Sequence, residues 1–246
     1  TKMSSKSAVK TVAGDGSLFR LVAVLTGSKN ALKGVGFFVG AALLSWLDYD
    51  GALLVMAAAL AVTVVGLLVF LNEDIGKSKK KPPLRSVLSK SSAINRLSAA
   101  RFFLFGSRDI WFVVALPVFL SDRLGWSHRG VGGFLAVWVI GYGIVQSFAP
   151  RLLARGGRKV DEVRAAQQWA LVLAAVSAVI AVLVALDAAV TTAIVGGLVV
   201  FGAAFAMNSS LHSFLVLAYS DDDEVALDVG FYYSANAAGR LVGTLL

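Results

Sequence analysis

The amino-acid sequence predicts an all-α membrane protein, a polytopic helical bundle with about seven transmembrane helices. Of the 246 residues, 57% are hydrophobic, and the mean hydropathy is +0.77. Only 15% of the residues are charged, whereas a soluble domain carries about 25%. The apolar residues fall into runs of about 20, the length of helix that crosses the hydrocarbon core of a bilayer.

The first two predicted helices cover residues 18–47 and 52–71, and the polar turn DYDG at 48–51 separates them. Both apolar runs are long enough to cross a bilayer. The segment that follows, 72–96, is rich in lysine and contains two adjacent prolines, which interrupt a helix. We therefore predict a solvated linker over this segment.

Five further apolar runs follow the linker, and polar residues bound them. The turn SDR follows the first run, the basic stretch PRLLARGGRK the second, Asp187 the third, and the acidic run DDDE the fourth. The predicted helices cover residues 97–120, 131–149, 163–186, 189–219 and 225–246. The basic linker (72–96) thus divides a first part with two predicted helices (1–71) from a second part with five (97–246).

The distribution of basic residues predicts the orientation in the membrane. Lysine and arginine are concentrated in segments 72–96 and 150–164, and short loops of this kind stay on the cytoplasmic side. The turns at 48–51 and 121–123 then lie outside. The acidic run at 221–224 falls inside, which is tolerated because acids contribute little to orientation. The net charge of +8 therefore reflects topology and gives no reason to expect a nucleic-acid partner.

Enzymatic and metal-binding signatures are missing from the sequence. The chain has no cysteine and two histidines, and the predicted helices contain no paired carboxylates, nucleophile elbow or metal-ligand cluster. Gly76, Lys77 and Ser78 match the end of a phosphate-binding loop, but Leu71 stands where its first glycine belongs. We expect no catalytic residue, cofactor or metal.

Positively charged side chains lie inside the predicted helices, with one comparably deep acid, Asp109. A lysine or arginine at the centre of a membrane helix costs on the order of 3 kcal/mol, so it persists where it meets a protein interior, a counter-charge or a polar ligand. The excess of cations predicts an anionic substrate, since arginine binds two oxygens at once and lysine supplies a point charge. The candidate substrate-binding cations are Lys29, Lys33, Arg101, Arg108 and Arg240.

Helical spacing predicts how these residues are grouped. Lys29 and Lys33 are four apart, and Arg101 and Arg108 are seven apart, so each pair shares a helix face. Asp109 points about 100° away from its neighbour, which predicts that the two do not pair with each other. Alternatively, the first arginine snorkels to the headgroups, and the deeper cations pair with Asp109 or with other acids.

The last two helices repeat this pattern. Asn208 and His212, like Asn236 and Arg240, are four apart and form polar stripes. We expect both asparagines to bind substrate. Asp109 and His212 are candidates for proton coupling, although the histidine is better explained as a packed, hydrogen-bonded side chain. Further residues that could line the same cavity are Trp111, Trp138, Tyr142 and Gln146.

Glycine spacing predicts close helix packing at two places. Gly36 and Gly40, like Gly239 and Gly243, are separated by three residues. This spacing lets neighbouring backbones approach within a membrane bundle.

Several long strings resemble the ArsJ-type organoarsenical efflux permeases, a branch of the major facilitator superfamily. They are KMSSKSAVK, LTGSKNALKGVGFF, SAARFFLFGSRDIWFVVALPVFL, GGFLAVWVIGYGIVQ and APRLL. The resemblance implies a partial major facilitator fold, with the seven helices corresponding to helices five to eleven of twelve. Thr1 as first residue, and a last run, RLVGTLL, that ends within an apolar stretch, likewise predict a fragment of a longer chain.

The stretch 150–159 resembles the superfamily loop signature G-x-L-a-D-r-x-G-R-K. Pro150 and Ala154 depart from it, which leaves no acid for a charge relay in this loop. The residues that match, with an implied role in conformational change, are Leu152, Arg155, Gly157, Arg158 and Lys159.

The resemblance implies an export function in the bacterial inner membrane. The implied substrate is 1-arseno-3-phosphoglycerate, formed when glyceraldehyde-3-phosphate dehydrogenase uses arsenate, and export confers arsenate resistance. The implied partners are this anion, the lipid bilayer and a functional link to the dehydrogenase, with a monomeric protein and no nucleic acid. The alternatives are a permease for another phosphorylated or carboxylated metabolite, and a non-transporting membrane scaffold.

Overall fold

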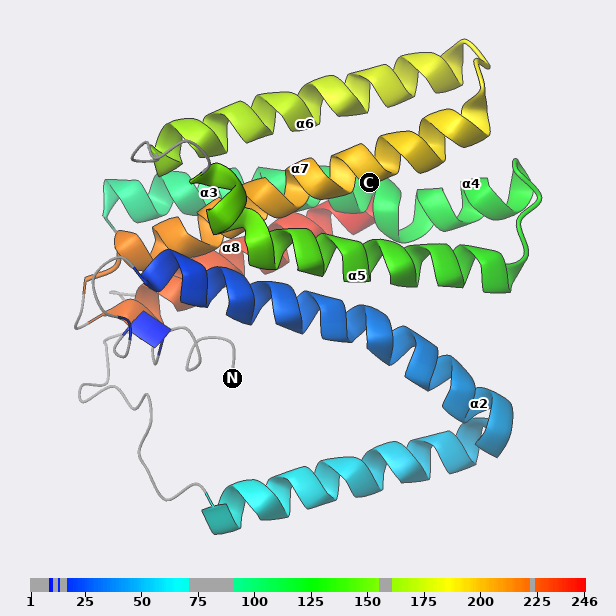
Figure 1. The fold of residues 1–246 in the computed structure, drawn as a ribbon, viewed down its shortest axis with the longest axis horizontal. Coiled ribbons are helices and arrows are strands. Elements are labelled where there is room, and N and C mark those ends of the chain that lie inside the picture. The colour runs from blue at the N-terminus through cyan, green and yellow to red at the C-terminus, as the bar shows by residue number, and fades with distance from the viewer. Residues whose placement is uncertain (1–8, 11–12, 14–16, 71–90, 155–160, 222–223) are drawn as a thin grey trace.

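The computed structural model describes residues 9–10, 13, 17–70, 91–154, 161–221 and 224–246. These ranges contain helices and turns and no strand, which confirms the predicted all-α class (Figure 1). The elements are α2 (Leu18–Phe70), α3 (Ser92–Ile110), the π-helix η2 (Trp111–Ala115), α4 (Leu116–Asp122), α5 (His128–Leu153), α6 (Glu162–Ala185), α7 (Val190–Ala218) and α8 (Val225–Leu245).

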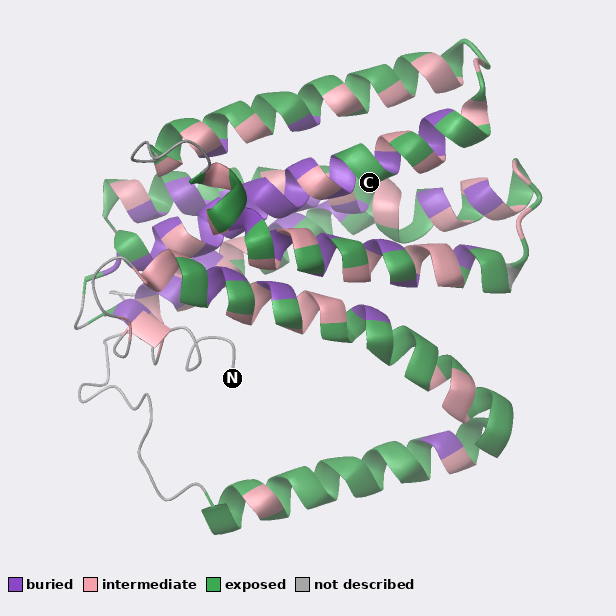
Figure 2. Cartoon of the chain, viewed as in Figure 1, coloured by how far each residue is buried: buried purple, intermediate pink, exposed green. Residues whose placement is uncertain are grey.

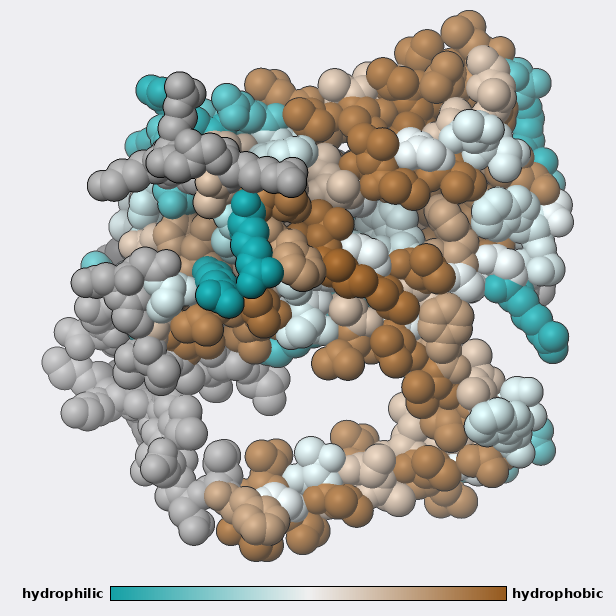
Figure 3. Space-filling model, viewed as in Figure 1, coloured by the Kyte–Doolittle hydropathy of each residue, from teal (hydrophilic) through white to brown (hydrophobic). Residues whose placement is uncertain are grey.

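Helix α2 contains the first two predicted spans as two arms of a hairpin. The chain reverses at Asp48, whose φ of 56° lies in the left-handed region, at the predicted polar turn. The second arm stands apart from the bundle, and nearly all of its residues are exposed (Figures 1 and 2). Figure 3 shows that hydrophobic residues cover most of this arm, as expected of a membrane-spanning segment.

The third predicted span is formed by α3, η2 and α4 in succession. Its helix begins at Ser92, inside the stretch predicted as linker, because Ser91 caps it and its Oγ accepts a hydrogen bond from the N–H of Ile94 at 3.2 Å. In η2 the N–H of Leu116 bonds the carbonyl of Trp111, five residues back, which inserts one extra residue into the helix.

Five helices are long and apolar enough to cross a membrane: Leu18–Phe70, Ser92–Asp122, Arg129–Leu153, Glu162–Ala185 and Val190–Ala218. Helix α8 has the length of a span, 21 residues, but is not among these five. Helices α3, α6 and α8 begin at one end of the bundle, and α5 and α7 begin at the other (Figure 1). This alternation agrees with repeated crossing of a bilayer.

The helices pack mainly as the pairs α2 with α5, α3 with α8, and α6 with α7. At the contact between α3 and α8, a Cβ on Gly239 or Gly243 would meet the backbone of Phe102 or Gly106, which confirms the close approach predicted there. Fully buried residues are concentrated on α7 (Figure 2), which contacts α2, α3, α5, α6 and α8.

The predicted close approach at Gly36 and Gly40 is wrong, since a Cβ at either would meet nothing within 4 Å. The contact of α2 with α5 uses other glycines of the same helices. A Cβ on Gly34 would lie 2.7 Å from the carbonyl oxygen of Ala136, and one on Gly143 would meet the backbone of α2. We call this contact the α2–α5 seam.

Replacing Gly143 with alanine should destabilise the protein, because the added methyl group has no room in the seam. Overpacking of this kind costs about 1 to 3 kcal/mol. Gly141, two residues away on the same helix, is exposed and has open space around it, so Gly141→Ala should be neutral or slightly stabilising. Melting of the two purified variants in detergent measures the difference, and equal melting temperatures would contradict the seam.

Candidate functional site

Arg101 on α3 is a buried cation with neutral partners. Its side chain is held by helices α7 and α8: Nε donates to Oδ1 of Asn236 and Nη1 donates to Oγ of Ser209, both at 3.1 Å. The guanidinium carbon lies 3.8 Å from the ring centroid of Phe105 and 5.2 Å from that of Tyr232. The residue is 4% exposed, so the alternative of a snorkelling arginine is wrong.

No carboxylate pairs with Arg101 in the part of the chain that the structure describes. A charge removed from water without a counter-ion costs several kcal/mol. Contact with aromatic faces offsets about 2 kcal/mol of this in a desolvated site. Arginine has five N–H donors, and two of them make the side-chain hydrogen bonds described above. The remaining donors and the uncompensated charge suit an anion with several oxygen atoms.

A chain of hydrogen bonds extends from this arginine to α2. Ser209 Oγ, which accepts from Arg101, also accepts from Nε2 of Gln146 on α5 at 3.3 Å. The Oε1 atom of Gln146 accepts from Nδ2 of Asn30 on α2 at 2.6 Å. We call the series Asn30, Gln146, Ser209, Arg101 and Asn236 the polar relay, and it connects α2, α5, α7, α3 and α8.

A second charged cluster lies further along α3. Asp109 has a fully buried side chain and accepts from Nε of Arg108 at 2.7 Å and from Nε of Arg240 on α8 at 2.6 Å. The side chain of Arg108 is 14% exposed and that of Arg240 is 49% exposed. Two arginines thus share one carboxylate, so the cluster keeps one net positive charge.

The prediction that Arg108 and Asp109 do not pair is wrong. The angle between neighbouring residues on a helix describes where Cβ points, but a long guanidinium side chain can fold back across it. Here the guanidinium carbon of Arg108 packs over the rings of Phe105, at 4.7 Å, and Phe205, at 5.2 Å. These rings direct the side chain along α3 onto the neighbouring carboxylate. The ring of Phe105 contacts both Arg101 and Arg108, which brings the two clusters together.

The other predicted site residues lie elsewhere. Lys29 is half-buried and Lys33 is exposed on α2, so neither belongs to the buried clusters. Asn208 is fully buried and donates from Nδ2 to the carbonyl of Ala166 on α6 at 3.1 Å, which turns it away from the relay. His212 is 6% exposed on the same helix, and its Nδ1 has no hydrogen-bond partner among the described residues.

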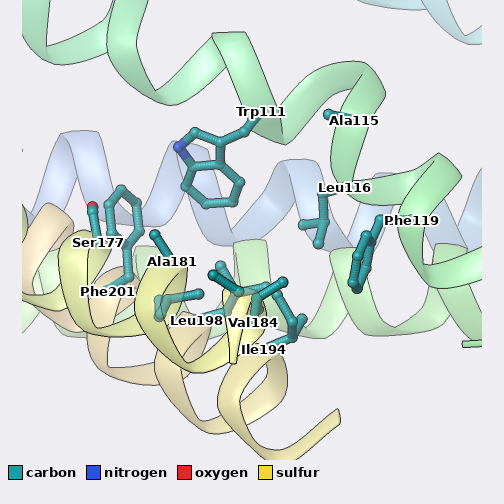
Figure 4. A pocket seen from close by; sticks show the side chains of 12 residues that line it. Trp111, Ala115, Leu116, Phe119, Ser177, Ala181, Val184, Ile194, Leu198 and Phe201 are labelled. Carbon is teal, nitrogen blue, oxygen red and sulfur yellow. The ribbon is translucent and has the colours of Figure 1, made fainter. Parts of the chain in front are cut away.

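Two cavities adjoin α7. One of about 670 Å³ lies among α3, α6, α7 and α8, and its lining includes Arg108, Asn208 and His212. The other, of about 500 Å³, is bordered by the rings of Trp111 and Phe119 and by aliphatic side chains of α6 and α7 (Figure 4). The second cavity has no charged residue in its lining and does not suit an anion.

The predicted loop residues fall outside the described ranges, and the structure adds nothing about them. These are Arg155, Gly157, Arg158 and Lys159.

Sequence reasoning did not identify Asn30 and Ser209. Serine in an apolar helix gives no signal, because its hydroxyl usually bonds the backbone of its own helix, as Ser147 and Ser177 do here. Asn30 does carry a signal, since it is an amide within a long apolar run and lies between two lysines. Gln146 was among the residues predicted to line the cavity, and in the structure it donates a hydrogen bond to Ser209 in the polar relay.

Comparison with known proteins identifies one family. The model of the Major Facilitator Superfamily matches residues 12–244. No curated protein and no solved structure matches the chain.

Substituting Asp109 should destabilise the protein, because the nearly buried guanidinium of Arg108 would lose its counter-charge. Breaking a buried ion pair by removing one partner costs about 3 to 5 kcal/mol. We therefore expect Asp109→Asn to lower the melting temperature clearly, and Arg108→Gln combined with Asp109→Asn to recover part of the loss. Arg240→Gln should cost less than Arg108→Gln, because its side chain is half exposed. A double variant no more stable than Asp109→Asn would refute the pairing.

Proposed function

The chain belongs to the major facilitator superfamily and is an integral membrane transporter, and we propose that its substrate is an anionic organoarsenical that it exports from the cytoplasm. The substrate of this proposal is 1-arseno-3-phosphoglycerate, and transport proceeds by alternating access around a site near the middle of the membrane.

The observation that carries the proposal is the environment of Arg101. A transporter for cations would gain nothing from a buried guanidinium with neutral hydrogen-bond partners. An anion supplies the missing charge, and a phosphoryl or arsenyl group offers oxygens in the geometry that an arginine fork binds. Arg108 and Arg240 lie in the neighbouring cluster and add one further net positive charge, which suits a substrate with two acidic groups.

The resemblance of strings such as ARFFLFGSRDIWF to the organoarsenical permeases supports the choice of substrate. Arg101, Arg108 and Asp109 all lie within this string. Export would remove arsenate that the dehydrogenase has built into the ester, and the protein would act as a monomer in the bacterial inner membrane. Asp109 and His212 are the proposed candidates for proton coupling.

A permease for another phosphorylated or carboxylated metabolite is the second candidate. The same observation favours it, because the polar relay contains no group that distinguishes arsenate from phosphate. Membership of the superfamily favours either transporter over a non-transporting scaffold.

The two candidates are separated by growth of arsenate-sensitive cells that express the full chain, with and without the dehydrogenase. Protection from arsenate that needs both proteins supports organoarsenical export. Protection that does not depend on the dehydrogenase would reject the arsenical in favour of the second candidate. The same conclusion would follow if the cells were not protected while membrane vesicles transported phosphorylated metabolites.

Arg101→Gln should weaken anion binding without unfolding the protein, because it removes a buried charge that has no counter-charge. Loss of charge-assisted hydrogen bonds should weaken binding roughly tenfold to hundredfold. A stable probe is 3-phosphoglycerate, whose binding raises the melting temperature of the purified chain. The control is Arg129→Gln on the exposed start of α5, which should bind normally. An unchanged response of Arg101→Gln would remove this arginine from the site.

A further inference from the structure

We propose that Gln146 couples occupation of the anion site at Arg101 to the α2–α5 seam. This inference rests on the proposed function, because it assigns a mechanical role to the residues that contact the proposed anion-binding arginine. It makes Gln146 and Asn30 positioning residues that act through Ser209.

The first step of the argument is that Ser209 Oγ serves two donors. Nη1 of Arg101 and Nε2 of Gln146 both bond this one oxygen, at 3.1 and 3.3 Å. An anion that binds Arg101 offers charged oxygens, which are stronger acceptors than a hydroxyl. The guanidinium then turns from Ser209 to the anion, and Gln146 remains as a donor to Ser209 Oγ.

The second step concerns the other end of the Gln146 side chain. This carboxamide is fully buried, and its Oε1 accepts from Asn30 Nδ2 at 2.6 Å. A carboxamide is rigid and planar, so a shift of Nε2 toward Ser209 on α7 moves Oε1 away from Asn30 on α2. Anion binding therefore weakens the hydrogen bond between α2 and α5.

The third step is the position of this bond within the seam. Asn30 lies on α2 between Gly27 and Gly34, both of which contact α5 too closely to admit a Cβ. A polar bond at such a tightly packed contact is costly to leave half-made. Loss of this bond on anion binding would therefore favour separation of α2 from α5. A ligand drives a conformational change only through contacts that differ between the two states, and this bond would be such a contact.

The experiment uses the full chain and its lack of cysteine. Ser147 lies next to Gln146 and its Oγ faces Gly27 across the seam, so Ser147→Cys places a single thiol there for maleimide labelling. We expect 3-phosphoglycerate to raise the labelling rate several-fold as the seam loosens. Adding Asn30→Ala should make labelling fast and insensitive to the anion.

Binding and transport are measured on Asn30→Ala in the native background. The variant leaves every hydrogen bond of Arg101 in place and removes the bond that anion binding would otherwise weaken. Stabilisation by 3-phosphoglycerate should therefore be at least as large as in the unmodified chain, while the maximal transport rate falls about tenfold or more. Ser28→Ala, an exposed α2 residue that bonds its own helix, should change neither. Asn30→Ser serves the same test if the alanine variant does not fold.

The outcomes separate this inference from the proposed function. If Asn30→Ala transports at the normal rate and the thiol still responds to the anion, coupling through Gln146 is rejected and anion transport stands. If 3-phosphoglycerate, phosphate and arsenate all fail to stabilise the unmodified chain, the anion site itself is rejected and the coupling with it.

Discussion

The candidate site depends on the burial of one arginine without a carboxylate. Arg101 is removed from water, and its partners are an amide, a hydroxyl and two aromatic faces. Together these offset a part of the desolvation cost, and three helices, α3, α7 and α8, must stay aligned to supply them. An anion that fits such a site supplies the missing counter-charge, so its binding is favourable. The proposed transport of anions requires this property. Asp109, which neutralises one neighbouring arginine, keeps the surplus charge local.

Close helix packing makes this alignment possible. Backbones approach at the α2–α5 seam and between α3 and α8 because glycines remove the side chains that would separate them. The polar relay crosses both contacts, since Asn30 bonds Gln146 across the first and Arg101 bonds Asn236 across the second. Small residues therefore set the distances, and short polar side chains can reach each other only because of them.

The fold followed from the sequence, and the site followed in part. Apolar runs and polar turns are one-dimensional signals, so the helices and the reversal near Asp48 were predictable. The early start of α3 was missed because its capping serine lies in a lysine-rich stretch. The pairing of Arg108 with Asp109 was only the alternative interpretation of the sequence, because it depends on rings that fold a long side chain back along the helix. Which glycines would meet a neighbour was undetermined, since spacing alone does not say which face another helix covers.

The π-turn after Asp109 has a consequence for how this helix is compared with others. One additional residue rotates everything beyond it by about 100° relative to an uninterrupted helix. Phe119 lies beyond the turn and faces the apolar cavity, whereas a projection continued from Arg101 would assign it another direction. A sequence alignment that omits a one-residue gap at this point would equate residues on different faces of the helix. The charged part of this span before the π-helix (α3) and the apolar part after it (α4) therefore have separate helical phases, and the faces that they present to neighbouring helices can change independently in evolution.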